Sequence, residues 1–278
     1  MIRRLFLLLI LLTPLGCSLV TDGENYTDLS GPRYSSASGP SPTSPAQDTI
    51  KVVSYNVKFS KKTDLAGELL KTHQDLAGAD IIFLQEMEPQ DVETIAKKLN
   101  YNYVYYPAVR HPLYNQDFGN AILTKWPIIH DKKVILPHLD PDKLQRIAVG
   151  AVIKIGDKFV MAYSLHMRIW LHPFQRRNQM ERLLHSVPPI DYCIIAGDFN
   201  TFTKFNRQII EEAFQEHRFT LATKEVDWSY KHWYLFNKKS LMDYIFVKNM
   251  DVLGSGSIKN QKASDHLPVW AQVKLKGI

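Results

Sequence analysis

An apolar run that ends abruptly in polar side chains spans residues 191–200, Asp-Tyr-Cys-Ile-Ile-Ala-Gly-Asp-Phe-Asn. A short apolar run bounded by turn residues is typical of a buried strand. Asp198 and Asn200 then lie where the strand leaves its sheet, which is where open α/β sheets bind ligands. Gly-Asp-Phe-Asn can also form an Asx-type turn without any chemistry. The interpretation therefore depends on how the other strands end.

Strands and helices alternate from residue 50 onward. Apolar runs predict strands at 51–57, 81–85, 101–106, 119–124, 146–155, 158–166, 241–247 and 267–275, the fifth and sixth of which form a hairpin. Amphipathic segments predict helices at 65–76, 91–99, 173–187 and 203–217. Thr203 is a natural N-cap for the last helix. This order predicts an α/β fold with two packed mixed sheets and helices outside them.

Polar groups also stand at the ends of other predicted strands. They are Asn56, Glu86 and His166 after three strands, Asp265 and His266 before the last strand, and Asp243 inside the apolar segment 241–247. Each of these residues also has an alternative role that involves no functional site: a turn cap, a solvated carboxylate, a histidine in the core, or a carboxylate held by a structural partner. Their shared placement favours one site, because charges that are buried together require a metal ion or reciprocal pairing.

The ordered set of motifs resembles the endonuclease/exonuclease/phosphatase superfamily, which includes deoxyribonucleases, abasic-site endonucleases, neutral sphingomyelinases and inositol polyphosphate phosphatases. The resemblance rests on Ser54-Tyr-Asn56, Gln85-Glu86, Gly119-Asn120, Ser164-Leu-His166, Gly197-Asp-Phe-Asn200, Met242-Asp-Tyr-Ile-Phe246 and Ser264-Asp-His-Leu-Pro-Val269. It implies a four-layer sandwich of two packed mixed β-sheets flanked by helices. The implied activity is metal-dependent hydrolysis of a phosphoric ester by water.

The resemblance also implies roles for these residues. The expected ligands of Mg²⁺ or Mn²⁺ are Asn56, Glu86 and Asp265. The expected contacts to the substrate phosphate are His166, Asn200, Arg146 and Asn120, and a surface role is equally open for Arg146. Asp198 is expected to position or deprotonate the attacking water. Asp243 is expected to orient His266, as a buried carboxylate does for a catalytic histidine.

Several features bear on the substrate. His166 is similar to the deoxyribonuclease and sphingomyelinase branches, whereas Phe199 departs from the Gly-Asp-Leu-Asn signature of inositol 5-phosphatases. Segments 168–177 and 226–239 mix aromatic and basic residues, which suits stacking on bases, a bilayer interface, or core packing of the rings. A net charge of +6 suits anionic partners without choosing among them. We expect a nuclease acting on DNA or RNA first, a phospholipid or sphingolipid phosphodiesterase second, and a non-catalytic binding module third.

The N-terminus predicts export. Residues 1–17 resemble a bacterial lipoprotein signal peptide, with Arg3 and Arg4 before an apolar stretch and Cys17 as the lipidation site. Pro14 departs from that motif, so ordinary secretion is the alternative. Residues 18–49, rich in Ser and Pro, predict a flexible tether, and residues 50–278 the catalytic domain. We expect a monomer anchored to a membrane outside the cytoplasm, in the outer membrane and periplasm or at the cell surface.

Overall fold

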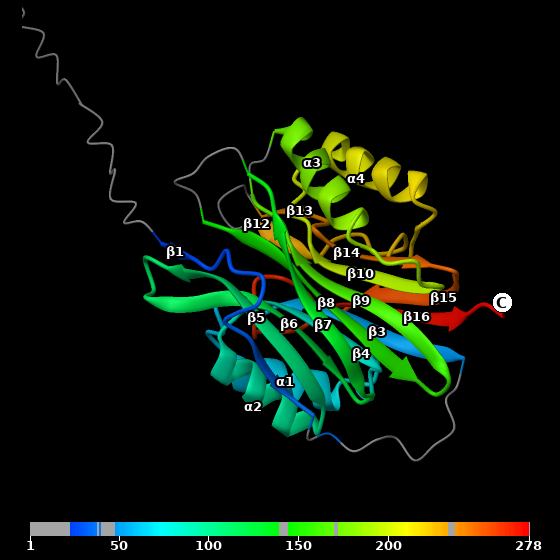
Figure 1. Ribbon diagram of the computed structural model, residues 1–278, viewed down its shortest axis with the longest axis horizontal. Helices are drawn as coiled ribbons and strands as arrows, with labels where there is room; N and C mark the ends of the chain where they lie inside the picture. The colour runs from blue at the N-terminus through cyan, green and yellow to red at the C-terminus, as the bar shows by residue number, and fades with distance from the viewer. Residues whose placement is uncertain are drawn as a thin grey trace, which may run out of the picture.

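The computed structural model describes residues 23–37, 39, 48–138, 144–169, 172–232 and 237–277. Two large β-sheets pack face to face, and a pair of helices covers the outer face of each (Figure 1). Each layer buries its apolar face against the next, which makes a four-layer α/β sandwich. The predicted fold class is confirmed.

The first sheet has the strand order β1-β5-β6-β4-β3-β16-β15, with β2 also paired to β5. Its strands are β1 (Glu24–Asn25), β2 (Tyr34–Ser36), β3 (Thr49–Asn56), β4 (Ile81–Met87), β5 (Asn102–His111), β6 (Gln116–Thr124), β15 (Met250–Ser257) and β16 (Val269–Leu275). Helices α1 (Thr63–Thr72) and α2 (Pro89–Leu99) cover its outer face. Strands β3 and β4 are parallel, so their carboxyl ends lie side by side.

The second sheet has the strand order β11-β14-β10-β9-β8-β7. Its strands are β7 (Ile128–Leu136), β8 (Arg146–Ile155), β9 (Lys158–His166), β10 (Tyr192–Asp198), β11 (Thr220–Leu221) and β14 (Asp243–Lys248). Helices α3 (Pro173–Leu184) and α4 (Lys204–Glu216) cover its outer face, and β12 (Tyr230–His232) pairs separately with β13 (Lys238–Ser240). Strands β9 and β10 are parallel, as β3 and β4 are in the other sheet.

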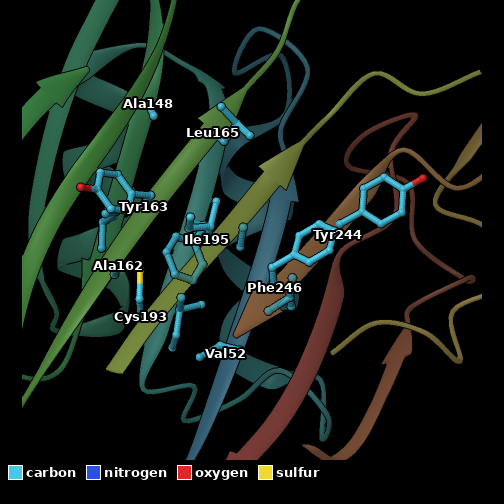
Figure 2. Packing of buried hydrophobic residues seen from close by; sticks show 14 of the residues in the cluster. Val52, Ala148, Ala162, Tyr163, Leu165, Cys193, Ile195, Tyr244 and Phe246 are labelled. Atoms are coloured by element: carbon cyan, nitrogen blue, oxygen red, sulfur yellow. The ribbon is translucent and has the colours of Figure 1, made fainter. Parts of the chain in front are cut away.

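The central strands are buried on both faces, which explains their nearly continuous apolar sequences. Cys193 and Ile195 of β10 pack in the same buried cluster as Val52 and Phe246 (Figure 2). Burying a side chain the size of Ile195 contributes about 1.5–3 kcal/mol. Cys193 is fully buried there, so the interpretation of its thiol as a small core hydrophobe is confirmed.

The helices α2 and α4 end close to the predicted residues, whereas α1 and α3 end earlier than predicted, and α3, predicted to reach residue 187, ends at Leu184. Thr203 caps α4 as predicted, with its side-chain oxygen accepting a hydrogen bond from the backbone N–H of Asn206 at 3.1 Å. Helix α1 was predicted to reach residue 76 but ends at Thr72, because the backbone of His73 turns to an extended conformation. Leu76 still packs in the core from the following turn, which is why the apolar spacing overstated the helix.

The predicted tether over 18–49 requires a correction in its middle, because residues 23–37 pack on the domain. Strands β1 and β2 pair with β5, which would otherwise be a long open edge. The buried ammonium of Lys133 donates hydrogen bonds to the carbonyl oxygens of Tyr26 (3.1 Å) and Gly31 (2.8 Å). Backbone pairing and hydrogen bonds from side chains such as Lys133 and Arg33 hold this segment on the domain.

Two predictions about the N-terminus fall outside the described residues. They are the signal peptide at 1–17 with its lipidation site Cys17, and the parts of the tether at 18–22, 38 and 40–47. Among the residues that the structure describes, no helix is long and apolar enough to span a membrane.

Candidate active site

The polar strand ends predicted from the sequence meet at one edge of the sandwich. Asp198 ends β10 and lies in register with His166 at the end of β9 on one side and Asp243 at the start of β14 on the other. In the facing sheet, Asn56 ends β3 next to the end of β4, where Glu86 lies. Parallel pairing within each sheet and packing between the sheets therefore bring these side chains together.

Unusual backbone geometry helps to position two of them. Glu86 lies at a β-bulge in β4 with a φ of 59°, in the left-handed region that non-glycine residues rarely adopt. Gly197, just before Asp198, has a φ of 151°, and a Cβ atom there would lie 1.9 Å from the carbonyl oxygen of Leu165. Only glycine therefore allows β10 to approach β9 this closely beside the site.

The buried carboxylate of Asp198 and the partly buried carboxylate of Glu86 share one amide donor. The Nδ2 atom of Asn56 donates hydrogen bonds of 3.0 Å to Oε1 of Glu86 and of 3.0 Å to Oδ2 of Asp198. Burial raises the pKa of Glu86 and raises the pKa of Asp198 to about 7. The Nε2 atom of His166 lies 3.8 Å from Glu86 Oε1 and 3.6 Å from Asp198 Oδ2. Such a concentration of partly compensated negative charge is suited to a bound cation.

His166 differs from the other histidine of the site in its charge. Burial lowers the pKa of His166 well below its ordinary value, and the positive charge of Arg146 lowers the pKa further. The ring is therefore neutral at pH 7 and carries a single N–H.

His266 and Asp243 form a buried pair. Nδ1 of His266 lies 2.9 Å from Oδ2 of Asp243, and its Nε2 lies 3.7 Å from Oδ2 of Asp198. Burial alone would lower the pKa of His266, but the carboxylates of Asp243 and Asp198 outweigh it and raise the pKa to about 10. The imidazolium form is stabilised at neutral pH, which makes His266 a donor of hydrogen bonds and protons.

Arg146 lies at the start of β8 and faces the same site. Its guanidinium carbon lies 4.9 Å from the ring centre of Phe118, while its Nε and Nη1 atoms are buried without a hydrogen-bond partner among the described residues. Burial lowers the pKa of the guanidinium. Buried donors without partners are rare in native proteins and suit an anionic ligand.

A pocket of about 170 Å³ opens over these groups. The predicted site residues that line it are Glu86, Arg146, His166, Asp198, Asn200, Asp265 and His266. Asn56 and Asp243 do not line the pocket. They lie behind the lining residues and orient Glu86, Asp198 and His266 through hydrogen bonds. A larger hollow of about 370 Å³ lies beside α2, away from these residues.

Asn120 does not fit its predicted role as a phosphate contact. Its Nδ2 atom donates to the carbonyl oxygens of Ile147 at 2.9 Å and Ser164 at 3.4 Å, both in the facing sheet. Asn120 is buried and is not among the described residues that line the pocket. It joins the two sheets beneath the site, because its strand position points the amide between the layers.

Sequence reasoning missed two basic residues that shape the site. The ammonium of Lys58 lies 2.6 Å from Oδ2 of Asp265 and lines the pocket. Arg176 of α3 is fully buried and donates hydrogen bonds to the carbonyl oxygens of Phe199 (2.6 Å) and Asn200 (3.2 Å), which fix the turn after β10. Lys58 follows Asn56 by two residues, a signal that was available, whereas nothing local marks Arg176 as buried.

Comparisons with known proteins agree with this arrangement. The sequence profile of the Endonuclease/Exonuclease/phosphatase family matches residues 53–266. The fold is similar to that of an endonuclease/exonuclease/phosphatase from Bacteroides vulgatus, with a TM-score of 0.66, 17% identity, and coverage of 82% of this chain and 99% of that chain. A comparison with curated proteins finds no match.

Two further solved structures share the fold. Mannosyl-6-phosphatase Bt3783 from Bacteroides thetaiotaomicron VPI-5482 has a TM-score of 0.61 at 18% identity, and 81% of this chain and 99% of that chain are covered. D. rerio TDP2, complexed with single strand DNA product, has a TM-score of 0.64 at 15% identity, with 81% of this chain and 99% of that chain covered.

Proposed function

The chain belongs to the endonuclease/exonuclease/phosphatase family, whose members hydrolyse phosphoric esters, and we propose that this member is an exported, metal-dependent phosphodiesterase that cleaves DNA or RNA. The proposal depends on one observation: negatively charged and positively charged side chains line the same small pocket and face each other across it. The carboxylates of Glu86 and Asp198 face the buried, unpartnered donors of Arg146 and the imidazolium of His266. A phosphate diester attacked by water requires both kinds of group.

Members of this family depend on a divalent metal ion, and the donors present here fit one. Ligand atoms of Glu86, His166 and Asp198 lie within 4.8 Å of one another, and burial disfavours the charge on both carboxylates when no cation is near. We assign Glu86 as the principal ligand of Mg²⁺ or Mn²⁺, with Asn56 and Asp265 beside it. When bound, the ion supplies positive charge to the phosphoryl oxygens and the leaving oxygen.

Asp198 is suited to activate the attacking water. Burial raises the pKa of Asp198 above that of an ordinary aspartate, which makes its carboxylate a stronger base and suits it to accept a proton from water. The backbone N–H of Asn200 holds the other carboxylate oxygen at 2.9 Å, so Oδ2 keeps a fixed direction. In this proposal, the water proton moves to Oδ2 of Asp198.

The remaining residues bind the phosphate as its charge develops. His266 donates through Nε2, and Asp243 maintains both the orientation and the charge of its ring. The side-chain amide of Asn200 donates one hydrogen to the carbonyl of Met167 and keeps a second for the phosphate. Arg146 supplies two further donors. Donors fixed in advance act most strongly in a partly buried site such as this.

The cellular location is a separate part of the proposal. The sequence of residues 1–17 supports export and anchoring through a lipid on Cys17, with secretion as the alternative. Replacing Cys17 with Ser in the producing cell should move the full chain from the membrane fraction to the soluble fraction. An unchanged distribution would reject the lipid anchor.

The nuclease assignment is tested with the full chain in detergent. Supercoiled plasmid, single-stranded DNA and RNA are incubated in Mg²⁺, in Mn²⁺ and in EDTA, with His266→Ala as the inactive variant. His73→Ala, a change at the end of α1 away from the pocket, is the matched control. We expect cleavage that requires the metal and His266 and survives in the control. Hydrolysis of a sugar phosphate or a choline phospholipid, with all nucleic acids intact, would reject the nuclease in favour of those substrates.

A further inference from the structure

A second, larger hollow adjoins the active-site pocket. It measures about 460 Å³, and Phe202 lines both cavities. Thr201 and Leu241 of the hollow directly neighbour Asn200 and Met242 of the pocket in sequence, so the two cavities share a wall. A substrate that fills the pocket can therefore extend past Phe202 without leaving the surface of the protein.

The lining of this basic hollow is positively charged. Its basic residues are Lys204, Arg207, Lys238 and Lys239. Its acidic residue, Asp227, is already paired with Lys259 at 3.0 Å, and Arg207 pairs with Glu211. Lys204 and Lys238 are exposed and make no ion pair within the described part of the chain. Two ammonium groups are thus available to an anion.

A series of ring contacts connects the reacting histidine with the basic hollow. The ring of Tyr230 lies 4.7 Å from that of His266 and 4.7 Å from that of His232. The ring of His232 lies 5.3 Å from that of Phe202. Lys239 lies over the ring of Trp228, with 4.7 Å between its ammonium and the ring centre. Aromatic rings beside lysines are the combination that binds unpaired bases and the phosphates between them.

We propose that the basic hollow is a subsite for a backbone phosphate that neighbours the scissile one, and that the natural substrate is single-stranded nucleic acid. This inference rests on the proposed function. A sugar monophosphate carries one anionic group, which the pocket already receives, and would leave the ammonium groups of Lys204 and Lys238 unused. A bilayer presents a flat surface, whereas these lysines line a concavity, which a flexible strand can enter.

The test compares two substrates of the full chain in Mg²⁺. Bis(4-nitrophenyl) phosphate has one phosphate and no flanking phosphates, whereas a single-stranded oligonucleotide supplies flanking phosphates as well. The variant Lys204→Gln/Lys238→Gln should lower the ratio of kcat/KM for the oligonucleotide to that for the small diester about tenfold at low salt, and should weaken the dependence of KM on salt. Lys71→Gln/Lys154→Gln removes the same charge from exposed positions elsewhere and should leave the ratio unchanged.

The outcomes separate this inference from the proposed function. If the unaltered chain cleaves neither substrate, the proposed function fails. If it cleaves both, but the two double variants give the same ratio, the subsite is rejected and the proposed function stands. Vesicles containing an anionic phospholipid provide a third comparison, made with both double variants in the Cys17→Ser chain so that a lipid anchor does not dominate binding. If Lys204→Gln/Lys238→Gln loses vesicle binding while its oligonucleotide ratio stays at the control value, the basic hollow serves a lipid surface and the inference is overturned.

Discussion

Asp243 holds His266 through a hydrogen bond of 2.9 Å between Oδ2 and Nδ1, in a setting where both side chains are buried. In Asp243→Asn the ring loses the negative charge that raises its pKa, and an amide can present its NH₂ group to Nδ1 in place of an oxygen. We expect kcat to fall by about 10²- to 10⁴-fold with a smaller change in KM. Steady-state kinetics with bis(4-nitrophenyl) phosphate measure both. Asp251→Asn, at an exposed position in β15, is the control, and a loss of less than about threefold in kcat for Asp243→Asn would contradict the role.

Glu86 is expected to control metal binding. Its carboxylate is largely buried, and burial raises its pKa, so the ionised form destabilises the metal-free protein. Glu86→Gln should therefore unfold at the same or a higher temperature than the unaltered chain in EDTA. In Mg²⁺ the unaltered chain gains stability by binding the ion, and the variant should lose most of that gain. Thermal unfolding with increasing Mg²⁺ measures the difference. An equal rise in both proteins would exclude Glu86 as a ligand.

Asn120 is expected to matter for stability and not for substrate binding. Asn120→Ala removes the side-chain donor to the carbonyl oxygens of Ile147 and Ser164 between the sheets. The free energy of unfolding should fall by about 1–3 kcal/mol. The KM for bis(4-nitrophenyl) phosphate, measured well below the unfolding temperature, should stay within about twofold. A large rise in KM without a loss of stability would restore the direct phosphate contact.

Arg33 is expected to hold the segment 23–37 on the domain through its ion pair with Asp131, and the strength of this pair should depend on pH. Its guanidinium donates to both carboxylate oxygens of Asp131, at 2.7 and 2.6 Å. Burial raises the pKa of Asp131, but Arg33 and the hydroxyl of Tyr106 outweigh it, so the pKa is lowered overall. A lowered pKa means that the ionised carboxylate contributes stability above its unfolded pKa of 3.8 and loses that contribution as the pH falls through the lower folded value.

Arg33→Gln should therefore lower the free energy of unfolding by about 0.5–1 kcal/mol at pH 7, because Arg33 is 41% exposed and solvent screens the pair, and by less at pH 3, which lies below the unfolded pKa of 3.8. Urea unfolding at the two pH values measures the difference. Lys97→Gln, which breaks an exposed pair with Glu93 in α2, should cost little at either pH. An equal loss for Arg33→Gln at both pH values, or none at pH 7, would show that this pair does not hold the segment.

The main residues of the site could be predicted from the sequence, because the pattern that marks them lies within a few consecutive residues. An apolar run long enough to be buried on both faces, followed at once by polar groups, marks the end of a central strand wherever it lies in the sheet. This reasoning located Asp198, Glu86, His166 and Asn56, and the structure brings all four within reach of one another. The packing of two sheets between outer helices could also be predicted, because an apolar strand must be covered on both faces.

Only the tertiary structure decided which polar groups face the pocket and which join the layers. Asn56 and Asn120 both come from central strands, yet one contacts the carboxylates of the site and the other bonds backbone of the facing sheet. The pairing of β1 and β2 with β5, and of Lys58 with Asp265, joins residues far apart in the chain. Such contacts depend on strand register and on the packing of one sheet against the other. Local periodicity carries no information about either.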